Sequence, residues 1–353
     1  MPFYMVYWGG RGVYETTARP APQVVEDCLG IVQLLSDGTV TRSDDYSVVP
    51  PVCNVPPGLP VQWKDVVYDT GHGLRLRMYT PTSHVRTDSG EKKKLPVLVY
   101  FHGGGFCIAS FELLNFHAGA LRLVGELPAV VLSADYRLAP EHRLPAAHED
   151  AETVLSWLRG QAASSSSAAD ADPWLAAWAD FGRVFVCGDS CGGNIAHHLT
   201  VSCGSGKIAL DPARLAGCVM LWPYFGGEEK MPSEAPPPAD NSSSAAMNIV
   251  LFDQMWRLAL PAGSTRDHPA ANPFGPESPP LDGVPFPPVL IVDPERDVLR
   301  DRIADYAARL KAMGKHVELV KFEGQDHGFF VFDPMSEASG ELVRVVRLFV
   351  YGV

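Results

Sequence analysis

The sequence predicts an α/β fold in which a mostly parallel central sheet is flanked by helices. Short apolar runs typical of buried strands alternate with longer helix-like stretches, as a parallel sheet with crossover helices requires. Two glycine-rich motifs, an acid and a histidine each follow one of these apolar runs. The expected central strands are residues 97–101, 129–134, 184–187, 217–221, 289–292 and 317–322. The expected helices are residues 146–158, 194–201, 301–313 and 336–349.

The flanking segments complete one large domain. Residues 63–79 contain two runs of alternating apolar and polar side chains, which suits an antiparallel hairpin at the sheet edge. Polar residues 81–94, 160–172 and 228–246 are expected to be surface loops, none long enough to separate independent domains. With 353 residues, of which 46% are hydrophobic and 20% charged, the chain can bury a sizeable core.

The net charge and the cysteine content limit which partners and which cellular compartment we expect for this protein. A net charge of −12 argues against nucleic acid and anionic membranes, because both require a basic surface. No apolar stretch approaches the length of a bilayer span, and the first residues lack the pattern of a secretory signal. The seven cysteines show no metal-site spacing, and we expect reduced thiols, no metal and no cofactor. The expected location is the cytoplasm, with the nucleus as a second location.

The most informative residue is Ser190, which lies in GDSCG at 188–192 between a strand-like and a helix-like segment. A G-x-S-x-G at such a junction is a nucleophile elbow, in which glycines flank the serine because a side chain beside the strained turn would clash. The motif alone is a loose pattern, so an acyl-transfer activity needs partners elsewhere in the chain.

Those partners are present. HGGGF at 102–106 follows a strand and is the kind of glycine-rich loop that supplies oxyanion-hole amides. Asp297 and His327 each follow a later strand, giving the order Ser, Asp, His. Asp301 and Glu295 are alternative acids, but Asp301 is expected in the first turn of a helix, where a carboxylate also stabilises the helix N-terminus. The sequence therefore predicts a Ser190, Asp297 and His327 triad for acyl-bond hydrolysis.

These motifs together resemble one family. HGGGF at 102–106, YRLAPE at 136–141, GDSCGGN at 188–194 and DVLRD at 297–301 look like the plant carboxylesterases of the hormone-sensitive-lipase class, which have the α/β-hydrolase fold. That class also contains the gibberellin receptor and 2-hydroxyisoflavanone dehydratase. Finer features, including FGGEE at 225–229, resemble the branch that hydrolyses strigolactones. The resemblance implies that the amides of Gly104, Gly105 and Cys191 form the oxyanion hole.

The resemblance also implies a domain plan. Residues 1–21 are expected to be a poorly ordered leader, residues 22–62 the N-terminal part of a cap, and residues 63–353 the hydrolase domain. An insertion at about 224–287, after the sixth strand, would complete the cap over the active site. Phe252, Met255 and Trp256, in its helix-like run at 247–260, are expected to line the substrate pocket together with Phe106 beside the glycine loop. An ordinary amphipathic helix packing on the domain would explain the same apolar face.

Several functions remain open. The first is a serine carboxylesterase acting on a small-molecule ester, with strigolactone as the specific substrate and generic short-chain esters as the alternative. The second is a non-hydrolytic hormone receptor, which in this class has lost the histidine that His327 retains here. The third is a dehydratase, whose nucleophile position holds threonine in related enzymes, whereas this chain has Ser190. The protein is expected to be a monomer or a homodimer.

Overall fold

A computed structural model describes residues 21–49, 58–83, 93–164, 171–235 and 248–352. The expected leader lies almost wholly outside the described residues, as do most of 81–94 and 228–246 and the middle of 160–172. Residues 160–164, at the start of the expected loop 160–172, instead belong to the helix Ala146–Ser164. None of the described helices combines the length and the apolar character that crossing a bilayer requires.

An eight-stranded sheet forms the centre of the protein, in the order β11-β10-β9-β8-β6-β7-β5-β4. Strands β6 to β11 pair in parallel, and β5 pairs antiparallel with both β4 and β7, so the expected edge hairpin is present. The strands are β4 (Val61–Asp69), β5 (Leu74–Pro81), β6 (Leu95–Phe101), β7 (Val130–Ala134), β8 (Ala179–Asp189), β9 (Leu215–Leu221), β10 (Val289–Pro294) and β11 (Val317–Phe322). All six expected central strands are therefore confirmed.

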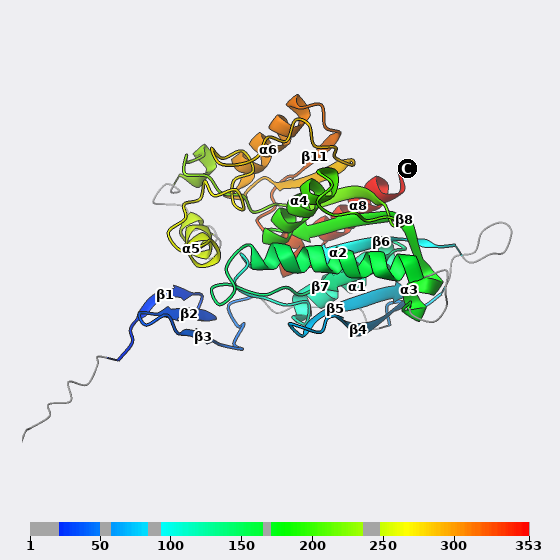
Figure 1. Cartoon of the computed structure of the whole chain (residues 1–353), viewed down its shortest axis with the longest axis horizontal. Helices are drawn as coiled ribbons and strands as arrows, with labels where there is room; N and C mark the ends of the chain where they lie inside the picture. The colour runs from blue at the N-terminus through cyan, green and yellow to red at the C-terminus, as the bar shows by residue number, and fades with distance from the viewer. Residues whose placement is uncertain (1–20, 50–57, 84–92, 165–170, 236–247, 353) are drawn as a thin grey trace, which may run out of the picture.

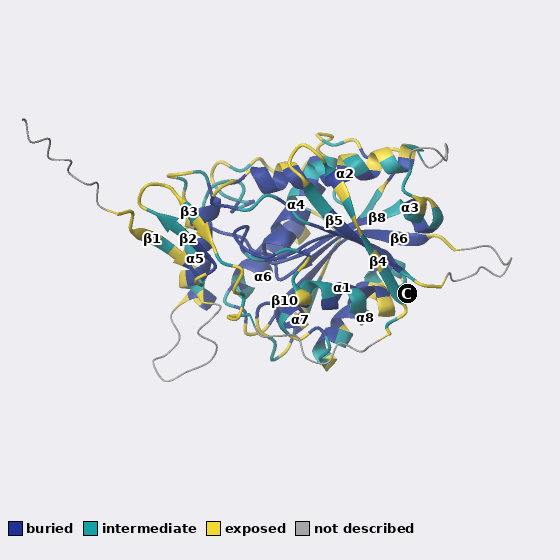
Figure 2. Ribbon diagram, turned by 90° about the horizontal axis from the view of Figure 1, so that it is seen from below, coloured by how far each residue is buried: buried dark blue, intermediate teal, exposed yellow. Residues whose placement is uncertain are grey.

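Helices cover both faces of this sheet, and the strands between them are buried (Figure 2). Strands β6 and β7 are buried along their whole length, as expected of parallel strands covered on both sides. Figure 2 shows α2, α3 and α4 on one face and α1, α7 and α8 on the other. The helices are α1 (Leu114–Glu126), α2 (Ala146–Ser164), α3 (Pro173–Trp178), α4 (Cys191–Gly204), α5 (Ile249–Ala259), α6 (Arg300–Ala312), α7 (Phe329–Phe332) and α8 (Glu337–Tyr351).

Two segments lie beside the carboxyl ends of the parallel strands rather than in the main sheet. The first is a small antiparallel sheet of β1 (Val24–Cys28), β2 (Val32–Leu35) and β3 (Val40–Arg42). The second contains α5 and the 3₁₀ turn Pro232–Glu234, between β9 and β10. Figure 1 shows β1 to β3 next to α5, although more than 200 residues separate them in the chain.

Ion pairs link the small sheet to α5 and to the segment after the glycine-rich loop. Glu26 of β1 accepts hydrogen bonds from Arg257 at 2.6 Å and Gln254 at 2.9 Å, both on α5. Arg42 of β3 pairs with Glu141 and donates to the carbonyl oxygen of Cys107, just past the glycine-rich loop. The sequence did not predict these three short strands, because their 5, 4 and 3 residues are too few to show a periodic pattern.

Candidate active site

Ser190 lies at the sharp turn between β8 and α4, with a positive φ of 54° and a ψ of −118°, a combination that non-glycine residues seldom adopt. The flanking glycines are required by close packing. A Cβ atom on Gly192 would lie 1.9 Å from the carbonyl oxygen of Phe101, and one on Gly188 would lie 2.3 Å from Gly192. The turn therefore holds the serine hydroxyl above the carboxyl edge of the sheet and leaves no room for larger residues.

His327 and Asp297 extend from this serine as a continuous chain of polar contacts. Nε2 of His327 lies 3.0 Å from Oγ of Ser190, and Nδ1 lies 2.7 Å from Oδ2 of Asp297. Because an ionised carboxylate can only accept, Nδ1 carries the proton and Nε2 is free to accept from the serine. All three side chains are at least 95% buried. The arrangement can pass the hydroxyl proton to the imidazole without exposing an ion to bulk water.

The two alternative acids have other partners. Asp301, in the first turn of α6, accepts a hydrogen bond from the Ser233 N–H at 2.7 Å. Glu295 accepts from the Gly324 N–H at 2.7 Å and so fixes a neighbouring loop. Among the described residues, Asp297 is the carboxylate in hydrogen-bonding contact with His327.

The glycine-rich loop lies against the elbow. Gly104 and Gly105 have φ of 113° and 60°, and a Cβ atom on Gly104 would lie 2.2 Å from the carbonyl oxygen of Ile108. Oδ1 of Asp189 accepts from the Gly103 N–H at 2.9 Å and from the Tyr100 hydroxyl at 2.6 Å. Burial raises the pKa of Asp189. This carboxyl group therefore ties the loop to the residue that precedes the candidate nucleophile.

Cys191 directly follows Ser190 at the start of α4. As the first residue of α4, it has an N–H group that points out of the helix N-terminus, where the helix dipole favours negative charge. Its buried thiol accepts hydrogen bonds from the Phe106 N–H at 3.2 Å, and it lies 3.3 Å from the Tyr136 hydroxyl. Burial raises the pKa of the thiol to about 12, which makes it a packing group rather than a reactive thiolate.

A pocket of about 320 Å³ opens at Ser190 and His327. Its volume lies at the lower end of the roughly 300–1,000 Å³ typical of small-molecule sites. Most of the wall is aliphatic or aromatic. The remaining lining residues are Leu29, Tyr46, Val48, Val49, Gly104, Ile108, Ala109, Leu113, Asn115, Phe116, Asp189, Met255, Asp326, Gly328, Val331 and Phe332.

Three of the four predicted pocket residues are not among the residues that line the pocket. Met255 lines the pocket, whereas Phe106, Phe252 and Trp256 belong to a buried aromatic cluster behind its wall, packed around Tyr224. The apolar face of α5 packs on the domain in this cluster. Phe252 still contacts the site, since its ring lies 4.9 Å from the His327 ring.

The sequence predicted a cap from residues 22–62 but did not identify the individual pocket residues in it, nor did it indicate Val331. Leu29, Tyr46 and Val48 come from turns around the small sheet, and Val331 comes from the four-residue helix α7. Turns and single-turn helices carry no hydrophobic period. Helix α1 was also missed because it begins without a hydrogen-bonding side chain at its N-cap, Leu113.

One group of potential metal ligands occurs within the described ranges, away from the pocket lining. Asp69, His72 and Asp150 bring three ligand atoms within 4.8 Å of one another. These groups already have partners, because Asp69 contacts His72 at 2.8 Å and Asp150 pairs with Arg137 at 2.7 Å. The pairing accounts for the cluster without an ion.

Comparison with known families agrees with this geometry. A family model described as the alpha/beta hydrolase fold matches residues 98–331, and a model of the carboxylesterase family matches residues 45–141. The first match spans well over half of the 353 residues. The chain therefore belongs to the α/β hydrolases, and it is a carboxylic ester hydrolase similar to the plant carboxylesterases.

Individual relatives are similar to this chain over most of their length. The chain is 34% identical to a 2-hydroxyisoflavanone dehydratase of Glycyrrhiza echinata, over 95% of this chain and 99% of the relative. It is 35% identical to probable carboxylesterase 8 of Arabidopsis thaliana, over 86% of this chain and 87% of the relative. Among solved structures, an esterase of Pyrobaculum calidifontis has a TM-score of 0.65 at 28% identity, covering 82% of this chain and 84% of the esterase.

Proposed function

We propose that the protein is a serine carboxylesterase in which Ser190 is the nucleophile, His327 the general base and Asp297 the acid that orients the base. The observation that supports this most directly is the unbroken contact chain of 3.0 Å and 2.7 Å through the two ring nitrogens of His327. Both contacts fall within hydrogen-bond reach, the geometric requirement for base-assisted attack.

The reaction follows in two steps. Ser190 Oγ attacks the ester carbonyl carbon while Nε2 of His327 takes its proton, and the imidazolium then returns that proton to the departing alcohol oxygen. A water molecule next attacks the acyl-enzyme carbonyl, with its proton passing to Nε2 and then to Ser190 Oγ as the acid product leaves. Asp297 keeps Nδ1 protonated and stabilises the imidazolium in both steps.

In this proposal the oxyanion binds the amides of Gly104, Gly105 and Cys191. Removing one such donor typically costs about 3 kcal/mol of transition-state stabilisation. The loop therefore contributes substantially to catalysis, although one of its donors contributes less than a side chain of the triad. All of these groups belong to the chain itself, and no cofactor takes part in the proposed steps.

The proposed substrate is a small, mostly apolar ester, specifically a strigolactone. The apolar pocket, the acidic chain and the motif resemblance to the strigolactone-hydrolysing branch support this choice. We also propose that residues 22–62 and 224–287 act as a cap, because Leu29, Tyr46 and Met255 of these segments line the pocket. The proposed location is the cytoplasm, although two tulip relatives, tuliposide A-converting enzymes, carry chloroplastic names.

The names of the relatives suggest a second function. The dehydratase of Glycyrrhiza echinata is similar to this chain over nearly its whole length, so elimination on the same oxyanion hole is a competing activity. Ser190 and its contact with His327 favour hydrolysis, since the pair is arranged for nucleophilic attack. The same intact histidine argues against a receptor without turnover.

The test is to incubate wild type and Ser190→Ala with a synthetic strigolactone and a short-chain p-nitrophenyl ester. Mass spectrometry would follow loss of the strigolactone and appearance of its tricyclic lactone and butenolide fragments. Turnover of both esters by wild type alone is the expected result. Turnover of only the simple ester would reject strigolactone as substrate. Equal hydrolysis by Ser190→Ala would reject the serine mechanism.

A further inference from the structure

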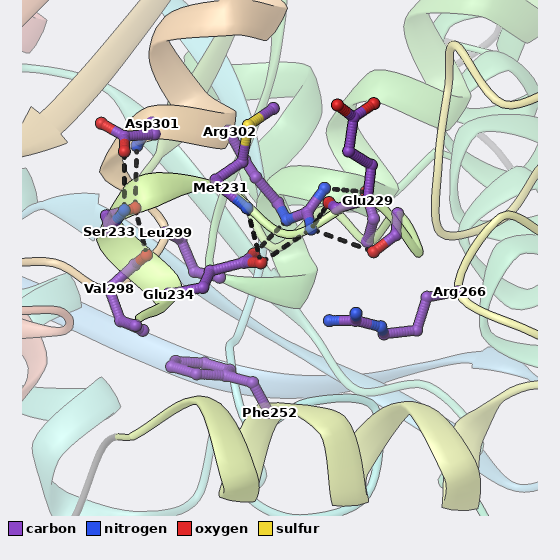
Figure 3. A network of polar contacts seen from close by, with 12 residues as sticks. Glu229, Met231, Ser233, Glu234, Phe252, Arg266, Val298, Leu299, Asp301 and Arg302 are labelled. Atoms are coloured by element: carbon purple, nitrogen blue, oxygen red, sulfur yellow. Dashed lines mark hydrogen bonds and ion pairs between the residues drawn. The ribbon is translucent and has the colours of Figure 1, made fainter. Parts of the chain in front are cut away.

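The loop that carries Asp297 is held by a residue of the distant insertion between β9 and β10. Ser233 donates from its hydroxyl to the carbonyl oxygen of Val298 at 2.7 Å and from its backbone N–H to the Asp301 carboxylate at 2.7 Å. Figure 3 shows Ser233 between these two partners. Both partners lie within four residues of Asp297, so one serine spans the irregular connection from the acid to α6.

The neighbouring residue anchors Ser233. Glu234 is almost wholly buried and pairs with Arg302, whose Nη2 lies 2.9 Å from the Glu234 carboxylate. The same guanidinium donates to the carbonyl oxygens of Gly226, Gly227 and Glu229 at 2.7–3.0 Å (Figure 3). Arg302 therefore fastens the beginning of the insertion to α6, directly behind the acid loop.

The orientation of the Asp297 carboxylate depends on the conformation of this loop. Oδ1 accepts from the Leu299 N–H at 2.9 Å, and Oδ2 accepts from His327. The Leu299 N–H belongs to the same peptide unit as the Val298 carbonyl that Ser233 holds. A rotation of that peptide would turn the N–H away from Oδ1 and change the direction of Oδ2 toward the histidine. Reactions held in a near-attack geometry lose rate when a group moves by about 1 Å.

We propose that Ser233 is a positioning residue for the catalytic acid, fixed in turn by the buried Glu234–Arg302 pair. This inference deepens the proposed function and depends on it. Its consequence is that the insertion has two roles in one reaction. Its helix α5 supplies Met255 to the pocket wall, and its first turn sets the orientation of Asp297 toward His327.

The test compares Ser233→Ala with Ser233→Thr, using a short-chain p-nitrophenyl ester. Alanine removes the hydroxyl bond to Val298, and we expect kcat to fall about fivefold while KM stays within about twofold of wild type. Threonine keeps a hydroxyl and should restore most of kcat. The matched control is Ser278→Ala, which removes a similar bond to the Asn272 carbonyl within the same insertion and should leave kcat unchanged.

A double-mutant cycle separates positioning from a general structural effect. In an Asp297→Asn background, Ser233→Ala should change kcat by less than about twofold, because the residue it orients has already lost its function. Repetition of the fivefold loss in that background would overturn the proposal, as would a wild-type kcat for Ser233→Ala. If Ser233→Ala does not fold, Asp301→Asn, which weakens the second contact of Ser233, is put through the same cycle and judged by the same outcomes.

Failure of the two proposals is distinguishable in this experiment. If wild type and Ser190→Ala hydrolyse the ester equally, the serine mechanism is wrong, and the positioning role of Ser233 is rejected with it. If wild type alone hydrolyses it and Ser233→Ala matches wild type, the mechanism stands and the positioning role of Ser233 is rejected.

Discussion

The triad and the pocket wall are built in opposite ways. Ser190, Asp297 and His327 lie at the ends of three parallel strands, are almost wholly buried and contact one another through polar atoms. On the wall, Val48 is half exposed, and Tyr46 comes from a turn beside the small sheet. In the proposed mechanism the chemistry therefore depends on the most constrained part of the fold, and we expect substrate choice to depend on connections that can vary with little cost to the core.

Replacing the acid is the strongest test of the constrained region. Asp297→Asn keeps the size of the side chain but removes the charge that holds Nδ1 protonated, and kcat should fall by about 10⁴. Steady-state hydrolysis of a p-nitrophenyl ester measures this. Glu295→Gln is the control and should retain wild-type kcat. A larger loss in Glu295→Gln than in Asp297→Asn would give the acid role to Glu295.

A change in the glycine loop should have the next largest effect. In Gly104→Ala the new Cβ atom would meet the Ile108 carbonyl oxygen at 2.2 Å, at a φ of 113° that alanine rarely adopts, so the loop must move. Displacement of an oxyanion donor should lower kcat by about 10²–10³. Gly283→Ala, whose Cβ atom would meet nothing within 4 Å, is the matched control. Wild-type kcat in Gly104→Ala would exclude this loop from the oxyanion hole.

The difference between the regions also explains what the sequence could predict. The elbow around Ser190, the glycine loop and the order of Asp297 and His327 were visible because each follows a strand with a strong apolar pattern. The choice of Asp297 over Asp301 and Glu295 rested on spacing, and the structure gives the other two acids different partners. The sequence motifs and the positions of these residues in the structure agree here, because each motif follows a parallel strand and the carboxyl ends of these strands lie along one edge of the sheet.

The pocket wall was less accessible to the same reasoning. Phe252 and Trp256 were expected in the pocket from the apolar face of α5, but that face packs into the domain core and leaves Met255 at the cavity. Which apolar side chain of a helix faces a pocket depends on how the helix is rotated and packed against the domain, and the hydrophobic period does not specify that. The contacts of Ser233 with Asp301 and of Glu234 with Arg302 could not be predicted for a related reason, since the partners lie more than 60 residues apart.

Met255 offers a test of the wall with a smaller effect. Its side chain lies over the glycine loop, because a Cβ atom on Gly105 would come within 2.1 Å of its sulfur. Met255→Ala should enlarge the pocket and raise the kcat/KM ratio of a p-nitrophenyl octanoate to an acetate by about tenfold. Val250→Ala, at a site 69% exposed on the same helix, is the control. An unchanged ratio would place the acyl chain elsewhere.

The ion pair between Glu26 of the small sheet and Arg257 of α5 should have the smallest effect, a pH-dependent contribution to the stability of the fold. Hydrogen bonds from Arg257 lower the pKa of Glu26 in the folded protein, so its contribution to stability is present above the unfolded pKa and is lost as pH falls through the folded one. Arg257 is more than half exposed, so Glu26→Gln should cost at most about 1 kcal/mol at pH 7. Thermal unfolding midpoints of wild type and variant should converge once the pH falls below the lowered pKa that Glu26 has in the folded protein. Glu112→Gln, which breaks an exposed pair with Arg75 on β5 of the main sheet, is the control for a general surface effect. A Glu26→Gln difference that persists at low pH would mean that packing, rather than charge, holds the small sheet on α5.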